Sequence, residues 1–201
     1  MIEDDRRLLI LDLDETLIHA VEAPLGRPAD FQVGPYFAYR RPHLKEFLAW
    51  AVEFFEVGVW TSASPDYARI VVDSIFPDHV KSRLRFVWSC DRCVRWFNPD
   101  TGDHEWLKDL RKVKRLGWPL DRVVMVDDSP EKLRRNYSNL VRVLPFWGHD
   151  DDIELRRLPR FLEWLRAHPD VRLPEKRGWQ YFDWVRGEAM PNDRACDLLI
   201  T

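Results

Sequence analysis

Cysteine is scarce in this chain, which has three cysteines among its 201 residues. A small and odd number of cysteines does not form a disulfide framework. The amino terminus is acidic, and Asp12 and Asp14 interrupt the apolar run behind it, so the pattern of a secretory signal is missing. These absences indicate a reducing compartment, and we predict a cytoplasmic protein.

Long apolar runs and an excess of charge of one sign are missing as well. No stretch approaches the ~18 apolar residues of a membrane-spanning helix, so we expect no contact with a membrane. The net charge of −3 at pH 7 argues against nucleic acid as a partner, because a binding surface for phosphate backbones is usually basic. No feature of the sequence indicates the oligomeric state.

The chain does contain a regular alternation of short apolar runs and amphipathic segments. The run from Leu8 to Leu11 is apolar throughout, as in a strand buried on both faces of a parallel sheet. Similar runs predict strands at 57–60, 84–88, 123–126 and 140–144. Helical spacing predicts helices that begin at Pro42, Ser64, Leu107, Pro130 and Asp151–Asp152, the third of them ending at Gly117. This alternation predicts an α/β fold with a doubly wound parallel sheet.

Two segments lie outside the alternation. Residues 19–40 hold prolines, glycines and aromatic residues without a helical period, and we predict a small flap hairpin there. Residues 171–201 are polar apart from an aromatic cluster at Trp179, Tyr181, Phe182 and Trp184. So much apolar surface is unfavourable in water, so we expect the aromatic cluster to be covered by the rest of the protein. We therefore predict a domain over residues 1–170 and an extension over residues 171–201 that packs on it.

Polar side chains follow three of the predicted strands, namely Asp12 and Asp14, Thr61 and Ser62, and Asp127 and Asp128. Ligands of doubly wound sheets bind beyond the carboxyl ends of the strands, so these carboxylates and hydroxyl groups would share one rim. Crowded carboxylates repel one another unless a cation offsets them. Oxygen ligands without a neighbouring His or Cys favour a hard ion, and we predict magnesium.

Such a rim suits a phosphoryl group, because the cation takes up charge on the phosphoryl oxygens. Aspartate is an established covalent nucleophile for phosphoryl groups. The i, i+2 spacing of Asp12 and Asp14 allows one to attack and the other to transfer protons. Lys108, which we place on the helix before the fourth strand, would supply a cation against the phosphate.

The stretch DLDETLIH, from Asp12 to His19, resembles the signature of the haloacid dehalogenase superfamily. More narrowly, it resembles the small C-terminal-domain phosphatases, which are NLI-interacting-factor-like. Further stretches agree in order and spacing: RP at 41–42 with EFL at 46–48, WTSA at 60–63, LKDL at 107–110 and VDDSP at 126–130. Several ordered motifs are far more specific than one, and together they span residues 7–166.

The resemblance implies a magnesium-dependent phosphatase that works through a phospho-aspartyl intermediate. Asp12 would be the nucleophile and Asp14 the general acid and base. Thr61, Ser62 and Lys108 would bind the phosphate.

The resemblance also implies a metal site. Magnesium would be held by Asp12, the backbone carbonyl of Asp14, and Asp128, while Thr16 and Asp127 would support the site. Many small members of the family have Asn in the place of Asp128, so this chain carries one more negative charge there.

The substrate class follows from the resemblance and from the spacing of the motifs. The segment between Thr61 and Lys108 is too short for a large cap domain, and an open site favours a macromolecular substrate. In this family the substrate is phosphoserine or phosphothreonine in protein. Two alternatives stay open: a phosphatase for nucleic-acid 3′ ends or small metabolites, and a catalytically silent binding scaffold.

Cys90 and Cys93 have the spacing of a zinc or redox pair. Zinc needs four ligands, and only His104 lies at a plausible distance downstream. A redox pair would open a helix in a thioredoxin-like unit. We therefore interpret the two cysteines as structural or incidental.

Overall fold

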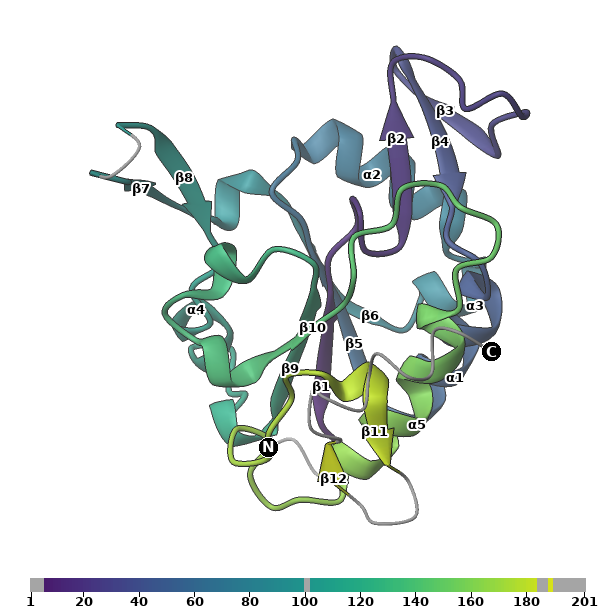
Figure 1. Ribbon diagram of the computed structural model, residues 1–201. Helices are drawn as coiled ribbons and strands as arrows, with labels where there is room; N and C mark the ends of the chain where they lie inside the picture. Colours follow the sequence, from purple (N-terminus) through teal and green to yellow (C-terminus); the bar gives the residue numbers. More distant parts are fainter. Residues whose placement is uncertain (1–5, 100–101, 184–187, 190–201) are drawn as a thin grey trace.

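The computed structural model describes residues 6–99, 102–183 and 188–189 (Figure 1). Its centre is a five-stranded parallel sheet in the order β10-β9-β1-β5-β6. These strands are β1 (Leu8–Leu11), β5 (Glu56–Trp60), β6 (Leu84–Trp88), β9 (Val123–Asp127) and β10 (Leu140–Arg142). The α/β parallel sheet predicted from the sequence is confirmed. The last strand is two residues shorter than predicted.

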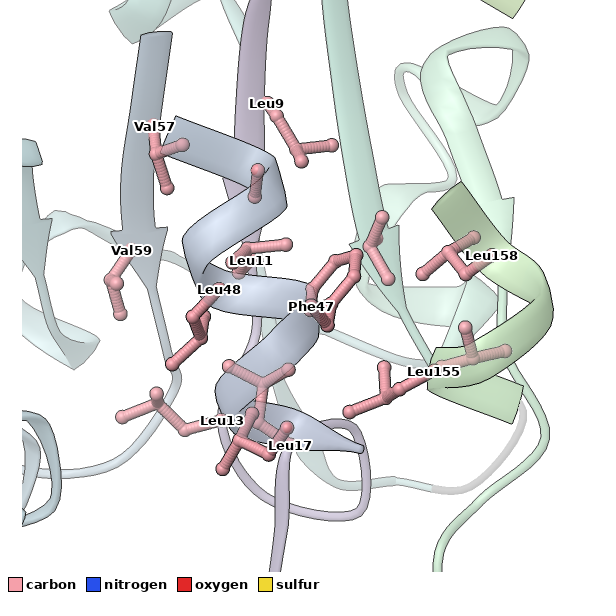
Figure 2. Packing of buried hydrophobic residues seen from close by; sticks show 14 of the residues in the cluster. Leu9, Leu11, Leu13, Leu17, Phe47, Leu48, Val57, Val59, Leu155 and Leu158 are labelled. Carbon is pink, nitrogen blue, oxygen red and sulfur yellow. The ribbon is translucent and has the colours of Figure 1, made fainter. Parts of the chain in front are cut away.

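Both faces of the sheet are covered, because successive side chains of a strand point to opposite sides. Leu9 and Leu11 of β1 belong to a core shared with three helices, α1 (Leu44–Phe54), α2 (Pro65–Ile75) and α5 (Glu154–Arg166). Figure 2 shows Phe47 of α1 packed among these side chains, on the side of α5. Leu8 and Ile10 belong to a second core, on the side of α4 (Arg111–Lys114). The sheet is therefore doubly wound.

The amino terminus of α2 is set by local sequence. The Ser64 side chain accepts a hydrogen bond from the Tyr67 backbone N–H at 3.3 Å, and Pro65 occupies the first helical position. A serine cap followed by proline satisfies one free N–H and fixes the first turn. This predicted helix start is confirmed.

The helix predicted from Leu107 to Leu116 is wrong. Leu107 ends strand β8 (His104–Leu107), and only Arg111–Lys114 are helical. Leu107, Leu110 and Val113 are buried at a spacing of three, which mimics a helix in the sequence. The backbone between them instead follows tertiary contacts, since Lys108 and Asp109 are both buried against partners from other segments. Lys108 therefore lies in a loop and not on a helix.

A second difference is a hairpin that the sequence interpretation omitted. It is formed by β7 (Val94–Phe97) and β8, which pair antiparallel. The flap is present and consists of three strands, β2 (Ile18–Val21), β3 (Phe31–Val33) and β4 (Tyr36–Arg40), in the order β2-β4-β3. The flap and the β7–β8 hairpin project from the same end of the molecule (Figure 1), and the described residues contain no large cap domain.

The remaining elements are short. They are α3 (Asp78–Lys81) and the 3-10 helices η1 (Cys90–Arg92), η2 (Leu120–Arg122), η3 (Pro130–Leu133), η4 (Tyr137–Asn139) and η5 (Trp179–Tyr181), with the two-residue strands β11 (Phe182–Asp183) and β12 (Glu188–Ala189). Within the part of the chain that the structure describes, no helix has both the length and the apolar character to cross a membrane.

Asp152, predicted to cap the last helix, does bond to its start, because its Oδ1 atom accepts the backbone N–H of Glu154, the first residue of α5, at 3.0 Å. Ile153 stands at the N-cap of α5 and makes no side-chain cap bond. Both carboxylate oxygens of Asp152 also accept hydrogen bonds of 2.8 Å from Arg41. One carboxylate therefore joins the start of α5 to the buried guanidinium of Arg41.

The start of the predicted carboxy-terminal extension lies against the sheet domain. Trp179 is buried, its ring stacks on Phe161 of α5 at 5.5 Å, and its indole N–H donates to the Arg142 carbonyl at 2.6 Å. Of the aromatic cluster, Trp184 lies outside the described residues. The division of the chain at residue 170 stays a prediction.

Candidate active site

The strand register brings the motif residues to one edge of the sheet. Leu11 pairs with Val59 of β5 and with Val126 of β9, so Asp12 comes level with the ends of both neighbours. The Asp12 backbone N–H donates to the Val126 carbonyl at 3.0 Å. Thr61 follows β5 at the same edge and donates its backbone N–H to the Trp88 carbonyl at 2.9 Å. The carboxyl ends of β1, β5 and β9 therefore form one rim.

Three carboxylates of this rim form a compact cluster. Asp12, Asp127 and Asp128 each place an oxygen within 4.8 Å of the others. Both oxygens of Asp127 are occupied, since one lies 2.6 Å from the Lys108 Nζ and the other accepts the Ser129 N–H at 2.9 Å. Among the described residues, by contrast, Asp12 Oδ2 and Asp128 Oδ1 are buried without a hydrogen-bond partner, while Asp12 Oδ1 lies 2.8 Å from the Lys108 ammonium.

Two lysines face Asp12. Lys108 is fully buried, with its Nζ 2.8 Å from Asp12 Oδ1. The Nζ of Lys132, from η3, lies 3.7 Å from the other oxygen, Oδ2. Burial acts to raise the pKa of Asp12, but the two ammonium groups outweigh it and hold the pKa below its usual range. Asp12 is therefore a buried carboxylate that stays ionised.

Asp14 lies in a different environment. The Tyr67 hydroxyl of α2 donates a hydrogen bond to Asp14 Oδ1. Burial, together with the nearby charge of Asp12, raises the pKa of Asp14 to about 6. The two aspartates of the motif thus differ in pKa, which is the arrangement expected of a nucleophile and a proton donor.

The turn between the motif and the flap is held from several sides. Glu15 adopts a left-handed backbone with φ 56°, and its carbonyl accepts the Phe146 N–H at 2.8 Å. Thr16 is buried with its hydroxyl unpaired among the described residues, and its carbonyl accepts a bond of 3.1 Å from Arg41. Thr61 is buried and accepts the Ala63 N–H on its hydroxyl at 3.1 Å, whereas Ser62 is half-buried.

Sequence reasoning missed Lys132 and Tyr67. Lys132 follows Pro130 in what resembles an ordinary exposed helical turn, and Tyr67 occupies the first turn of α2. Neither position carries a motif signal of its own. Only the packing of α2 and η3 at the ends of the strands places these side chains at Asp14 and Asp12.

The two cysteines of the 90–93 segment are free. Cys93 is buried, and its thiol points to the Thr61 carbonyl at 3.8 Å. Burial raises the pKa of the Cys93 thiol, as expected of a cysteine that contributes to packing.

The acidic cluster fits a divalent cation. Buried carboxylate oxygens without hydrogen bonds are costly, and a bound ion would satisfy them. All the donors are oxygens, which hard cations such as Mg²⁺ prefer. The unpaired atoms belong to Asp12 and Asp128, which are the two side chains assigned to magnesium from the sequence.

Comparisons with known proteins agree with this geometry. "CTD small phosphatase-like protein 2" of Dictyostelium discoideum is 33% identical over 174 residues, covering 82% of this chain and 28% of that protein. The human "carboxy-terminal domain RNA polymerase II polypeptide A small phosphatase 1" is 32% identical, with 84% of this chain and 63% of the relative covered. The chain thus spans less than two thirds of either relative.

A solved structure of the fission yeast RNA polymerase II CTD phosphatase Fcp1, bound to beryllium fluoride, has the same fold. Its TM-score is 0.62 at 20% identity, and the match covers 81% of this chain and 63% of that one. Residues 7–172 match the family described as NLI interacting factor-like phosphatase. The resemblance drawn from the motifs is confirmed, and the chain belongs to the NLI interacting factor-like phosphatase family.

Proposed function

We propose that the protein is a magnesium-dependent phosphatase that uses Asp12 as its nucleophile and acts on phosphoserine or phosphothreonine in proteins. The observation that carries the proposal is the state of Asp12. Its carboxylate is buried and ionised, faces two lysines, and has one oxygen, Oδ2, without a hydrogen bond from the described residues. A nucleophile needs a free lone pair of this kind.

The chemistry follows from the neighbours of Asp12. A carboxylate oxygen of Asp12 attacks the phosphorus, the bond from phosphorus to the serine or threonine oxygen breaks, and Asp14 gives that oxygen its proton. Water then attacks the phosphorus of the phospho-aspartate, the bond from phosphorus to the Asp12 oxygen breaks, Asp14 accepts a proton from this water, and inorganic phosphate leaves. The pKa of about 6 for Asp14 suits a group that both donates and accepts near neutral pH.

Asp12 and Asp128 would hold the magnesium ion, together with the backbone carbonyl of Asp14. When bound, the ion would stabilise negative charge on the phosphoryl oxygens. Asp127 would hold the Lys108 ammonium in place through the contact of 2.6 Å. Thr61 and Ser62 follow β5, and β5 and β9 lie on either side of β1. The two hydroxyl groups would therefore contact the phosphate from the side opposite to Asp127 and Asp128.

Two observations support a protein substrate. The described residues contain no large cap over the rim, so a segment of another protein could reach Asp12. The two relatives compared above are named as C-terminal-domain phosphatases. The alternatives are small phosphate esters and phosphorylated oligonucleotides, for which a chain with a net charge of −3 offers little attraction.

The test compares Asp12→Asn with the wild type on phosphopeptides, 3′-phosphorylated oligonucleotides and sugar phosphates, with magnesium present. Asn keeps the shape of the side chain but removes the nucleophile, so turnover should fall by about 10³-fold or more. EDTA should abolish wild-type turnover and magnesium should restore it. Wild-type turnover in EDTA, or an equally active Asp12→Asn variant, would contradict the mechanism. A preference for oligonucleotides or sugar phosphates would contradict the substrate class.

A further inference from the structure

The two lysines at Asp12 are not equivalent. The Lys108 side chain is 0% exposed, and its ammonium lies between Asp12 and Asp127 at 2.8 and 2.6 Å. The Lys132 side chain is 23% exposed, and its one ion-pair contact within the described residues is the longer one of 3.7 Å to Asp12 Oδ2. Lys108 is therefore held between two carboxylates, whereas Lys132 is partly exposed and lies farther from the one carboxylate that it pairs with.

The backbone ties Lys132 to the same site. The Lys108 N–H donates to the Lys132 carbonyl at 2.8 Å, and the Lys132 N–H donates to the Ser129 carbonyl at 3.1 Å. The lysine thus belongs to the turn that directly follows Asp127 and Asp128. The two backbone hydrogen bonds fix the position of Lys132, and its side chain is partly exposed.

The charge of Lys132 is secure. A lysine ammonium is charged at neutral pH, and the Asp12 carboxylate at 3.7 Å favours the charged form. The side chain therefore places a charged and partly exposed ammonium group beside the acidic cluster. An incoming phosphate dianion would meet this ammonium before it reached the buried Lys108.

We infer that Lys132 is a second phosphate-binding residue, which contacts a phosphoryl oxygen on the solvent side of the site, while Lys108 mainly holds Asp12 and Asp127 in position. This inference rests on the proposed function for its biological meaning. The contact itself requires only that phosphate enters the rim. Lys132 keeps its proton throughout and changes partner, from Asp12 to the phosphoryl group.

The test uses three variants: Lys132→Gln, Lys132→Arg and the control Lys45→Gln. Lys45 is an exposed residue of α1 and belongs neither to the acidic cluster nor to the segments that carry it, so its replacement removes the same charge from a different element. Two ligands are titrated by calorimetry, inorganic phosphate in the presence of magnesium and magnesium alone. Turnover of an aryl phosphate is measured in parallel.

Lys132→Gln should weaken phosphate binding by about tenfold or more, because a charge-assisted hydrogen bond is lost. Magnesium binding should stay equal or become tighter, since a positive charge has left the neighbourhood of the carboxylates. The Michaelis constant should rise more than kcat falls, and Lys132→Arg should restore much of the phosphate affinity. Lys45→Gln should change none of these values.

Two results would overturn the inference. One is unchanged phosphate affinity in Lys132→Gln, which would leave Lys132 as a partner of Asp12 alone. The other is a loss of phosphate and magnesium affinity together, which indicates a disturbed site. Lack of wild-type turnover would contradict the proposed function and leave the phosphate titration valid, so the two failures can be told apart.

Discussion

At the scale of single residues, Arg41 is the side chain that connects the site to the rest of the fold. It is buried, makes two bonds of 2.8 Å to Asp152, and donates to the carbonyls of Thr16 and Leu144 at 3.1 and 2.9 Å. The planar guanidinium can satisfy all three partners at once, which a lysine ammonium cannot do. Arg41 thus joins the turn after Asp14 to the segments before α5.

We therefore expect Arg41→Lys to lower the free energy of unfolding by about 1.5–3 kcal/mol, the usual contribution of a hydrogen bond to a charged group. Urea denaturation measures this change. The neighbouring Arg40→Lys is a matched control, because the Arg40 side chain is 40% exposed, lies 3.7 Å from Asp30 and donates to one carbonyl, that of Ser74, at 2.8 Å. An equal loss of unfolding free energy in the two variants would show that the buried position of Arg41 adds nothing to its contribution to stability.

At the scale of elements, the segment between β8 and α4 depends on Asp109. This residue is buried, accepts bonds from the Nε and Nη2 atoms of Arg111, and accepts a bond of 2.9 Å from Arg135. The Arg111 guanidinium, with support from Arg135, holds the pKa of Asp109 well below its usual range. Asp109 lies next to Lys108, so the same contacts fix the loop that carries the lysine.

Because the pKa of Asp109 is lowered in the folded state, the stability of the protein depends on pH with a known sign. The stabilisation by Asp109 should be fully present above its unfolded pKa of about 3.9 and should be lost as the pH falls toward the lower folded value. Asp109→Asn should therefore cost stability at pH 7 and show a smaller further loss between pH 4 and pH 2 than the wild type. Thermal unfolding across this range measures the difference, and parallel curves for the two proteins would contradict it.

The elements that the sequence predicted well are those with a single strong signal. The four apolar residues of β1 and the Ser64-Pro65 start of α2 leave little choice of structure. The segment around Lys108 was misread because a periodic set of buried apolar residues can also arise in a loop that is held by side-chain contacts. Its true conformation depends on Arg135 and on the acidic cluster, which lie far away in the sequence.

The β7–β8 hairpin was missed for another reason. Its register places Arg95 and Phe97 opposite Trp106 and His104 on an exposed face, so the usual alternation of apolar and polar residues is absent. The Asn98-Pro99 pair and Gly102, with φ 75°, are turn signals that could have located it. The rim motifs, in contrast, were predictable because parallel strands end at one edge.

At the scale of the whole molecule, the acidic cluster links metal binding to stability. Burial and the charge of Asp12 raise the pKa of Asp128, which shows how unfavourable these neighbouring charges are without a cation. Magnesium should therefore raise the melting temperature. At a concentration about 100 times the Kd the stabilisation should approach about 2.7 kcal/mol. Differential scanning calorimetry in magnesium and in EDTA measures it.

Asp128→Asn is the matched variant for this prediction. It should be more stable than the wild type in EDTA, because one repulsive charge is gone, and should gain less from magnesium. Potassium chloride at the same ionic strength controls for screening. If magnesium raised the melting temperature of the two proteins equally, Asp128 would not be a ligand of the ion. The cytoplasmic location expected from the sequence stays a prediction.

The outer strand β10 has a consequence for the protein in solution. Its Arg142 carbonyl receives the indole N–H of Trp179, 37 residues further along the chain, and also the Gln180 amide. An outer strand with free carbonyls is a template on which a second molecule can add a strand. The Trp179 indole occupies the Arg142 carbonyl, to which an added strand would bond. The solubility of the folded protein at high concentration therefore depends in part on one aromatic side chain, and a shortened chain that ends before Trp179 would be prone to self-association along β10.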